Sequence, residues 1–102
     1  MKEILGDWET KRVVVDGEWL MPGRSQKLFN HSPDGFNWGY GGSGPSQLAL
    51  ALLLKFGLSD ELAVRHHQRF KFDIIATLPQ DDFVLSTAVV RNWINTNVKE
   101  QF

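Results

Sequence analysis

The chain has 102 residues, of which 42% are hydrophobic and 23% are charged, and it contains no cysteine. These values fit one globular domain over residues 1–102, and they exclude a disulfide framework, thiolate metal sites and a cysteine nucleophile. A net charge of -1 argues against a general duplex-DNA binder and against a polybasic membrane binder.

The first forty residues predict antiparallel strands, because β-branched and aromatic residues alternate with turn sequences. Residues 12–15 and 18–20 flank Asp16-Gly17, a dipeptide typical of a type I′ hairpin turn. Turns rich in Pro and Gly precede two further extended segments, at residues 27–29 and 36–38. We therefore expect a meander of three or four strands. Acids within residues 2–7 interrupt the apolar stretch that a signal peptide needs, so we expect a cytoplasmic protein.

A buried central helix is predicted between Gly39 and Gly57. Residues 48–54 are Leu and Ala only, and a helix that is apolar on every face is buried on every face. Pro45 suits its first turn, with Gly44 as the N-cap and Gly57 just after the C-terminus.

The remaining chain predicts two more helices and a short strand. Ser59 is the expected N-cap of the first helix, and its apolar stripe recurs every four residues at Leu62, His66, Phe70, Ile74 and Leu78. Residues 70–74 also alternate, so a strand within residues 66–78 stays the rival interpretation. Residues 83–85 look extended, and Ser86 precedes a helix whose buried face would hold Val89, Val90, Trp93 and Ile94. Strands first and helices after predict an α+β fold, with a small antiparallel sheet packed on the central helix and two further helices.

The glycine-rich loop is the strongest candidate for a binding site. Gly39, Gly41 and Gly44 match the spacing of dinucleotide-binding loops, but the helix is not followed by a predicted parallel strand. The P-loop pattern also fails, because Pro45 stands in the place of its lysine.

What remains is a row of backbone N–H groups at the positive end of a buried helix, contributed by Gly41, Gly42, Ser43 and Gly44, which suits an anion. We expect Gly42 to have a positive φ or a close ligand contact. The competing interpretation is structural, with glycines that let the chain turn sharply into a tightly packed helix.

Other side chains complete the candidate ligand site. Trp38 and Tyr40 would stack on a ligand, and Arg65 and Arg69 would clamp its charge; core packing of Trp38 and a salt-bridged surface for the arginines are the alternatives. His31, His66 and His67 show no metal-ligand spacing, and His66 is expected to be a partly buried, hydrogen-bonded residue. We predict no metal, no cofactor and no catalytic residue.

The run from Phe36 through Gly39-Tyr40-Gly41-Gly42-Ser43-Gly44-Pro45 to Leu53 resembles the signature of a family of small bacterial, plasmid and phage proteins, a domain of unknown function. The resemblance extends to Phe70-Lys71, Leu78-Pro79 and Trp93, and so covers most of the chain. It implies a phage or mobile-element setting and no particular chemistry.

The expected function is a non-enzymatic binding module for a small anionic ligand, with a nucleotide or nucleotide signal as the leading class. The alternative is an inhibitor or adaptor that occludes a host defence protein. Its contacts would come from an aromatic surface at Trp8 and Trp19 or from an acidic rim at Asp81 and Asp82. We expect no membrane contact, and homo-oligomerisation stays open.

Overall fold

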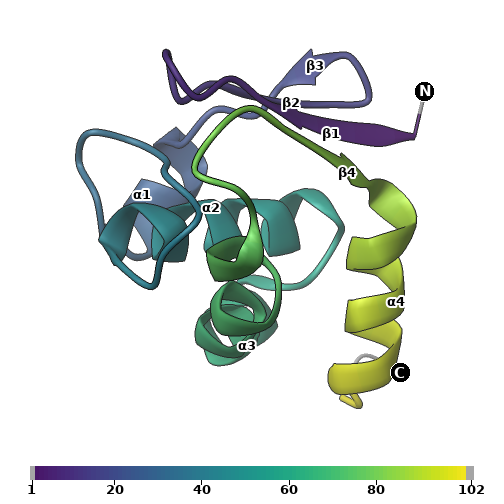
Figure 1. Cartoon of the computed structure of the whole chain (residues 1–102). Coiled ribbons are helices and arrows are strands. Elements are labelled where there is room, and N and C mark those ends of the chain that lie inside the picture. The colour runs from purple at the N-terminus through teal and green to yellow at the C-terminus, as the bar shows by residue number, and fades with distance from the viewer. Residues whose placement is uncertain (1, 101–102) are drawn as a thin grey trace.

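The structure is a computed structural model that describes residues 2–100. The strands are β1 (Glu3–Gly6), β2 (Val13–Val15), β3 (Glu18–Trp19) and β4 (Phe83–Ser86). The helices are α1 (Gly23–Leu28), α2 (Ser43–Lys55), α3 (Asp60–Asp73), the 3-10 helix η1 (Ile75–Thr77) and α4 (Thr87–Asn97). Figure 1 shows α2 between the sheet and α3, with α4 along one side. The fold is α+β, as predicted.

The four strands form one antiparallel sheet in the order β3-β2-β1-β4. The predicted hairpin joins β2 and β3, and its turn has φ values of 49° at Asp16 and 83° at Gly17. Two positive φ angles at the central residues are what a type I′ turn requires, so the Asp-Gly prediction is confirmed.

Two predicted strands are wrong. Residues 27–29 lie at the end of α1, which starts after Pro22 and in which the Ser25 hydroxyl donates to the Pro22 carbonyl. Residues 36–38 form no strand, because Phe36 and Trp38 are buried among core side chains rather than paired along a sheet. Two other strands complete the sheet: β4, which confirms the predicted extended segment 83–85, and β1, which was not among the predicted strands. They pair with each other through Ile4 opposite Leu85.

Helix α2 is the buried centre of the molecule, as predicted. Residues 44–54 are all buried, and the helix begins slightly earlier than expected, with Gly42 as its N-cap. Pro45 is therefore the third helical residue, where its missing N–H is still one of those without an intrahelical partner. Gly57, with φ of 99°, ends the helix, and the N–H of Leu58 donates to the Leu53 carbonyl at 3.1 Å. This is the αL termination that the sequence predicted.

Helix α3 confirms the helical interpretation of residues 60–73 and corrects its buried face. The Ser59 hydroxyl accepts the Leu62 N–H at 3.2 Å, as expected for an N-cap. The buried side chains are Ala63, His67, Phe70 and Lys71. A four-residue repeat drifts by about 40° per step around a helix, because each residue turns by about 100°. The predicted stripe is therefore displaced, and His67 rather than His66 lies in the core.

Helix α4 starts at the predicted cap, where the Ser86 hydroxyl accepts the Ala88 N–H at 3.2 Å. Val90, Trp93 and Ile94 are buried as expected, whereas Val89 is 38% exposed, outside the face that packs on the core. Within residues 2–100, none of the helices is both long and apolar enough to cross a membrane.

Candidate functional site

The glycine-rich loop enters α2 along a backbone path that its neighbours fix. Gly39 has φ of 82°, and a Cβ there would lie 3.1 Å from the Leu78 carbonyl oxygen. A Cβ at Gly44 would lie 2.6 Å from Cβ of Asn37. The fold itself therefore requires glycine at both positions, since a side chain would be strained at Gly39 and would collide with Asn37 at Gly44.

Gly41 and Gly42 differ, because each is covered by an aromatic ring that is itself exposed. The Phe72 ring lies against Gly41, 3.0 Å from where a Cβ would be, and the Tyr40 ring lies over Gly42. Gly42 has φ of -124°, so the expected positive φ is wrong. Tyr40 is 43% exposed and Phe72 is 59% exposed, which leaves two aromatic rings at the loop surface.

The N-terminus of α2 has no side-chain cap and no acid in its first turn. Helix α3 is the opposite case, with the Ser59 cap and with Asp60 and Glu61 in its first turn. The first N–H groups of a helix carry partial positive charge and need external acceptors. At α2 these belong to Ser43 and Gly44, so the positive end of a 13-residue helix is left without a compensating side chain.

Three of the residues predicted to contact a ligand are engaged elsewhere. Trp38 is completely buried, which leaves neither face free for stacking. Arg65 pairs with Glu61 at 2.7 Å and with Glu100 at 2.8 Å. Arg69 lies 3.6 Å from Asp73. Trp38 is therefore packed in the core, and the two arginines lie on a salt-bridged surface, as the alternative interpretations expected.

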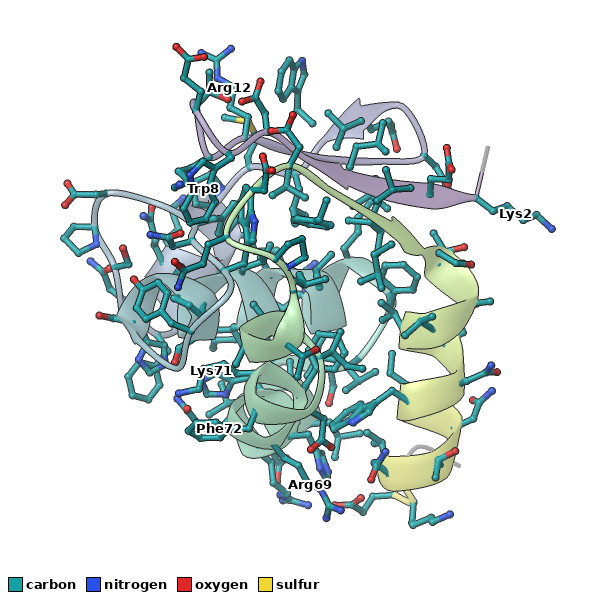
Figure 2. The ribbon with its side chains drawn as sticks, in the orientation of Figure 1. Lys2, Trp8, Arg12, Arg69, Lys71 and Phe72 are labelled. Atoms are coloured by element: carbon teal, nitrogen blue, oxygen red, sulfur yellow. The ribbon has the colours of Figure 1, made fainter. Side chains whose placement is uncertain are left out.

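Lys71 of α3 is a cationic side chain close to the glycine-rich loop. Its side chain is only 5% exposed, and it forms no ion pair or side-chain hydrogen bond with any residue in 2–100. Nζ lies 4.1 Å from the ring centroid of Phe72, the ring that covers Gly41. Figure 2 shows Lys71 and Phe72 projecting from α3 toward the side on which this loop lies. No fully buried side-chain nitrogen or oxygen among the described residues lacks a hydrogen-bond partner, so Nζ of Lys71 keeps access to solvent although most of the residue is covered.

Two histidines face each other next to Lys71. Nε2 of His31 lies 2.8 Å from Nε2 of His67, and Nδ1 of His67 lies 2.6 Å from the Val64 carbonyl. The carbonyl fixes the proton of His67 on Nδ1, so Nε2 of His67 accepts and Nε2 of His31 donates. A second donor to Nε2 of His67 is the Gln68 amide at 3.2 Å. Gln68 in turn accepts from the Ser46 hydroxyl at 3.4 Å, which connects the pair to the first turns of α2.

Both imidazoles are held in the neutral form. Burial is the main cause that lowers the pKa of His31, and the charges of His67 and Lys71 lower it further. Burial also lowers the pKa of His67, with a smaller contribution from Lys71. No carboxylate raises either pKa, and Lys71 contributes to lowering both.

Gln47 of α2 holds the segment that carries His31. Its side chain is completely buried. Oε1 accepts the N–H groups of His31 at 2.8 Å and Ser32 at 3.0 Å, and Nε2 donates to the Ser25 hydroxyl and the Phe29 carbonyl. All four polar positions of this amide are used, so the His31 segment is fixed to α2 rather than free to move. We call Lys71, His31, His67, Phe72, Tyr40 and the first turn of α2 the cationic cluster.

The comparisons with known proteins identify the chain at family level. Residues 6–96 match DUF6166, a family of unknown function. The chain belongs to DUF6166. Comparisons with curated proteins and with solved structures gave no match. The DUF6166 match confirms the expected membership of a family of unknown function, and it includes the glycine-rich loop, His31, His67 and Lys71.

Metal binding finds little support at the His pair of this DUF6166 member. Among residues 2–100, no group of three or more His, Asp or Glu side chains is placed to hold a metal ion. Lys71 lowers the pKa of both imidazoles, and its positive charge also repels a divalent cation.

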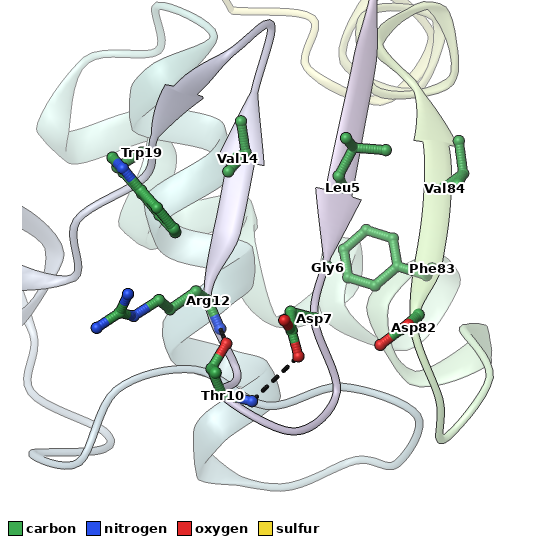
Figure 3. A pocket seen from close by; sticks show the side chains of 10 residues that line it. All are labelled: Leu5, Gly6, Asp7, Thr10, Arg12, Val14, Trp19, Asp82, Phe83 and Val84. Atoms are coloured by element: carbon green, nitrogen blue, oxygen red, sulfur yellow. Dashed lines mark hydrogen bonds between the residues drawn. The ribbon is translucent and has the colours of Figure 1, made fainter.

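A second surface of the DUF6166 chain is the outer face of the sheet. Figure 3 shows Leu5, Val14, Trp19 and Val84 in a row across the four strands. They line a groove of about 400 Å³, which Asp7, Arg12 and Asp82 border at one end. Trp19 is 58% exposed and Val84 68% exposed, although the solvated face of an antiparallel sheet is normally polar. Trp8, by contrast, is half-buried and packs edge-on against Trp38, so only Trp19 offers the expected exposed indole.

The loop glycines of this DUF6166 chain predict an order of stability. Gly44→Ala should lower the free energy of unfolding by about 2 kcal/mol, because the new methyl group collides with Asn37. Gly42→Ala should cost less than about 1 kcal/mol, because its φ is ordinary and the exposed Tyr40 ring can swing away. Urea unfolding of both variants measures the two costs. A larger cost for Gly42→Ala would contradict this account of the loop.

The His pair predicts a pH dependence of stability. Because the folded-state pKa values of His31 and His67 are lowered from 6.5, the unfolded chain takes up protons first as the pH falls. The free energy of unfolding should therefore be constant above pH 6.5 and decrease from pH 6.5 toward pH 5. Urea titrations at half-unit intervals measure the slope, which should be smaller in His31→Gln and unchanged in His66→Gln.

Acidic groups change the free energy of unfolding over a lower pH range than the two histidines. The pKa of Glu100 is lowered from 4.5, first by the hydrogen bond from Arg65, so its contribution to stability is lost only below pH 4.5. A flat profile between pH 6.5 and 5 would show that the two imidazoles are not held neutral.

Sequence reasoning located this site only in part. The glycine pattern and the helix start indicated the loop and α2, and Tyr40 does lie at the loop surface. His31, His67 and Lys71 were missed as a group, because residues far apart in sequence meet only when α3 packs along α2. The one available signal was Lys71 between two aromatic residues, Phe70 and Phe72.

Proposed function

We propose that the chain is a non-enzymatic binding module for a small phosphorylated ligand, with a nucleotide or nucleotide signal as the leading class. The observation that carries the proposal is Lys71, a lysine that is 5% exposed and has no ion pair within residues 2–100. It lies on the part of α3 whose Phe72 and Gln68 contact Gly41 and Ser46, at the uncapped start of α2. A phosphate group would accept from the first N–H groups of α2 and would neutralise Lys71.

The aromatic rings at the loop support a ligand that also has a planar part. Tyr40 and Phe72 are exposed, and both rings lie against the loop whose N–H groups lead into α2. Base stacking on aromatic side chains contributes about 1–3 kcal/mol per base. A nucleotide combines such a ring with the phosphate that the positive end of α2 requires.

Calorimetry with a panel of nucleotides and with inorganic phosphate tests the proposal. We expect at least one nucleotide to bind with a dissociation constant of 100 μM or tighter, which corresponds to about -5.5 kcal/mol. The absence of heat with every ligand of the panel at that sensitivity would overturn it.

The matched variants are Lys71→Met and Arg69→Gln. Lys71→Met keeps the apolar stem and removes the charge, so binding should weaken at least about tenfold, while the melting temperature in the absence of ligand stays equal or rises. Arg69 already pairs with Asp73, so Arg69→Gln should bind like the unmodified chain. Equal loss in both variants would indicate a general charge effect rather than a site at Lys71.

The biological setting that we propose follows the resemblance of the glycine-loop sequence to plasmid and phage proteins. A cytoplasmic binding module encoded by a mobile element would sequester a nucleotide signal of host defence. This proposal rests on analogy with mobile-element proteins. Because the ligand would then be a signal nucleotide, the calorimetric panel includes cyclic nucleotides.

A second candidate function is a protein-binding inhibitor or adaptor. The observation that favours it is the apolar outer face of the sheet, with Trp19 and the nearby Met21, which is 70% exposed. Trp, Met and Arg are enriched at protein interfaces. A pull-down from a bacterial host with the unmodified chain and with Trp19→Asp tests this function. A stoichiometric partner that survives high salt and is lost with Trp19→Asp would support it.

A further inference from the structure

The His31–His67 pair has one nitrogen that the protein leaves unused. Nε2 of His31 donates to Nε2 of His67, and Nδ1 of His67 donates to the Val64 carbonyl. No hydrogen bond among residues 2–100 involves Nδ1 of His31. A proton added to the pair can therefore go to Nδ1 of His31 without breaking any existing hydrogen bond.

The charge balance around the pair explains why this proton is absent in the unliganded protein. Among residues 2–100, Lys71 of α3 is the charged side chain that lowers the pKa of both rings. The side chains that contact the pair are neutral: Gln68 of α3 bonds Nε2 of His67, Gln47 of α2 accepts the His31 N–H, and Phe29 stacks on the His31 ring with centroids 4.1 Å apart. Gln68 and Gln47 are bonded in turn to the hydroxyls of Ser46 and Ser25. A second positive charge beside Lys71 is unfavourable until an anion arrives.

We infer that the cationic cluster binds phosphate monoesters as dianions and takes up one proton on Nδ1 of His31 as they bind. The proton comes from solvent, and the resulting N–H donates to a phosphate oxygen. Together with Lys71, the imidazolium then matches the two negative charges of a terminal phosphate. A phosphodiester carries a single charge, so it neutralises Lys71 and does not draw the proton. This inference rests on the proposed function and specifies its ligand class.

Calorimetry with AMP and with 3′,5′-cyclic AMP tests the inference. AMP should bind at least about tenfold more tightly than the cyclic diester, since only AMP has a dianionic phosphate. At pH 7, titrations of AMP in two buffers of different ionisation enthalpy should show uptake of a substantial fraction of one proton. Between pH 7 and pH 8.5 the affinity for AMP should fall about threefold or more, because anion binding raises the pKa of His31. The phosphate of AMP, with a second pKa of about 6, is already a dianion over that range.

His31→Gln and His66→Gln form the matched pair of variants. His31→Gln should bind AMP without proton uptake and with affinity independent of pH between 7 and 8.5. His66 contacts Glu100 instead of the cluster, so His66→Gln should retain both effects. Binding of AMP that needs Lys71, yet shows no proton uptake and no preference over the diester, would overturn this inference and leave the proposed function standing. No binding of AMP or of inorganic phosphate at any pH from 6 to 8.5 would overturn this inference, and no binding of any nucleotide of the panel over the same range would overturn both.

Discussion

Replacing Trp38 by Ala should lower the free energy of unfolding by about 3–5 kcal/mol, a large part of the stability of a chain of this size. Trp38 is completely buried, and its ring meets Phe83 edge-on with centroids 4.8 Å apart and Trp8 with centroids 5.7 Å apart. Its Nε1 also donates to the Asp81 carbonyl at 2.9 Å. The substitution therefore removes a packed ring and a hydrogen bond together, and urea unfolding measures the loss.

Trp19→Ala is the matched control for this prediction. Trp19 is the same residue type on the opposite face of the sheet and is 58% exposed, so its removal should cost less than about 1 kcal/mol. Similar costs for the two variants would mean that Trp38 does not occupy the core. Trp38→Phe separates the two contributions of the indole, because it keeps an aromatic ring and removes only the donor to Asp81.

Replacing Gln47 by Leu should lower the free energy of unfolding by about 2–4 kcal/mol, although leucine is the commonest residue of α2. The amide of Gln47 satisfies two backbone N–H groups, a carbonyl and a hydroxyl within the interior. Leucine fills a similar volume and leaves these groups without partners. Urea unfolding measures the cost, and amide hydrogen exchange at His31 and Ser32 should speed up even under conditions where the rest of the chain stays protected.

Gln80→Leu is the comparison for Gln47→Leu. Gln80 is exposed and makes one hydrogen bond, from Nε2 to the Gly39 carbonyl at 3.1 Å. Its replacement should change stability by less than about 1 kcal/mol. If Gln47→Leu were neutral or stabilising, the amide network would not fix the His31 segment, and the pre-arranged His pair would lose its support.

Features set by a few neighbouring residues were predictable from the sequence. The Asp16-Gly17 turn, the αL stop at Gly57 and the caps at Ser59 and Ser86 each follow from the conformational or hydrogen-bonding needs of one residue type. The all-round apolar run of α2 likewise required burial on every side.

Features set by distant partners were not predictable in the same way. Alternation of apolar residues around Phe36 and Trp38 fits a strand, but no neighbouring strand is available to pair with them, and both side chains serve the core. The arginines of α3 looked like anion clamps because charge alone does not reveal its partner. Two of their acids, Glu61 and Asp73, lie four residues away on the same helix, and the i,i+4 spacing of Arg69 and Asp73 supported the salt-bridged alternative. Only Glu100, which lies after α4, required the tertiary structure.

The position of β1 inside the sheet has a consequence for the order of folding. On one side β1 pairs with β2, about ten residues away, and on the other with β4, whose residues are roughly 80 positions later. The β1-β2-β3 meander can form early from local contacts, whereas pairing with β4 closes a loop of roughly 80 residues and costs more entropy. During synthesis one backbone edge of β1 therefore stays unpaired, and part of the apolar surface of α2 stays uncovered, until residue 86 has left the ribosome. A chaperone that shields extended segments would find its binding site on β1 in that interval.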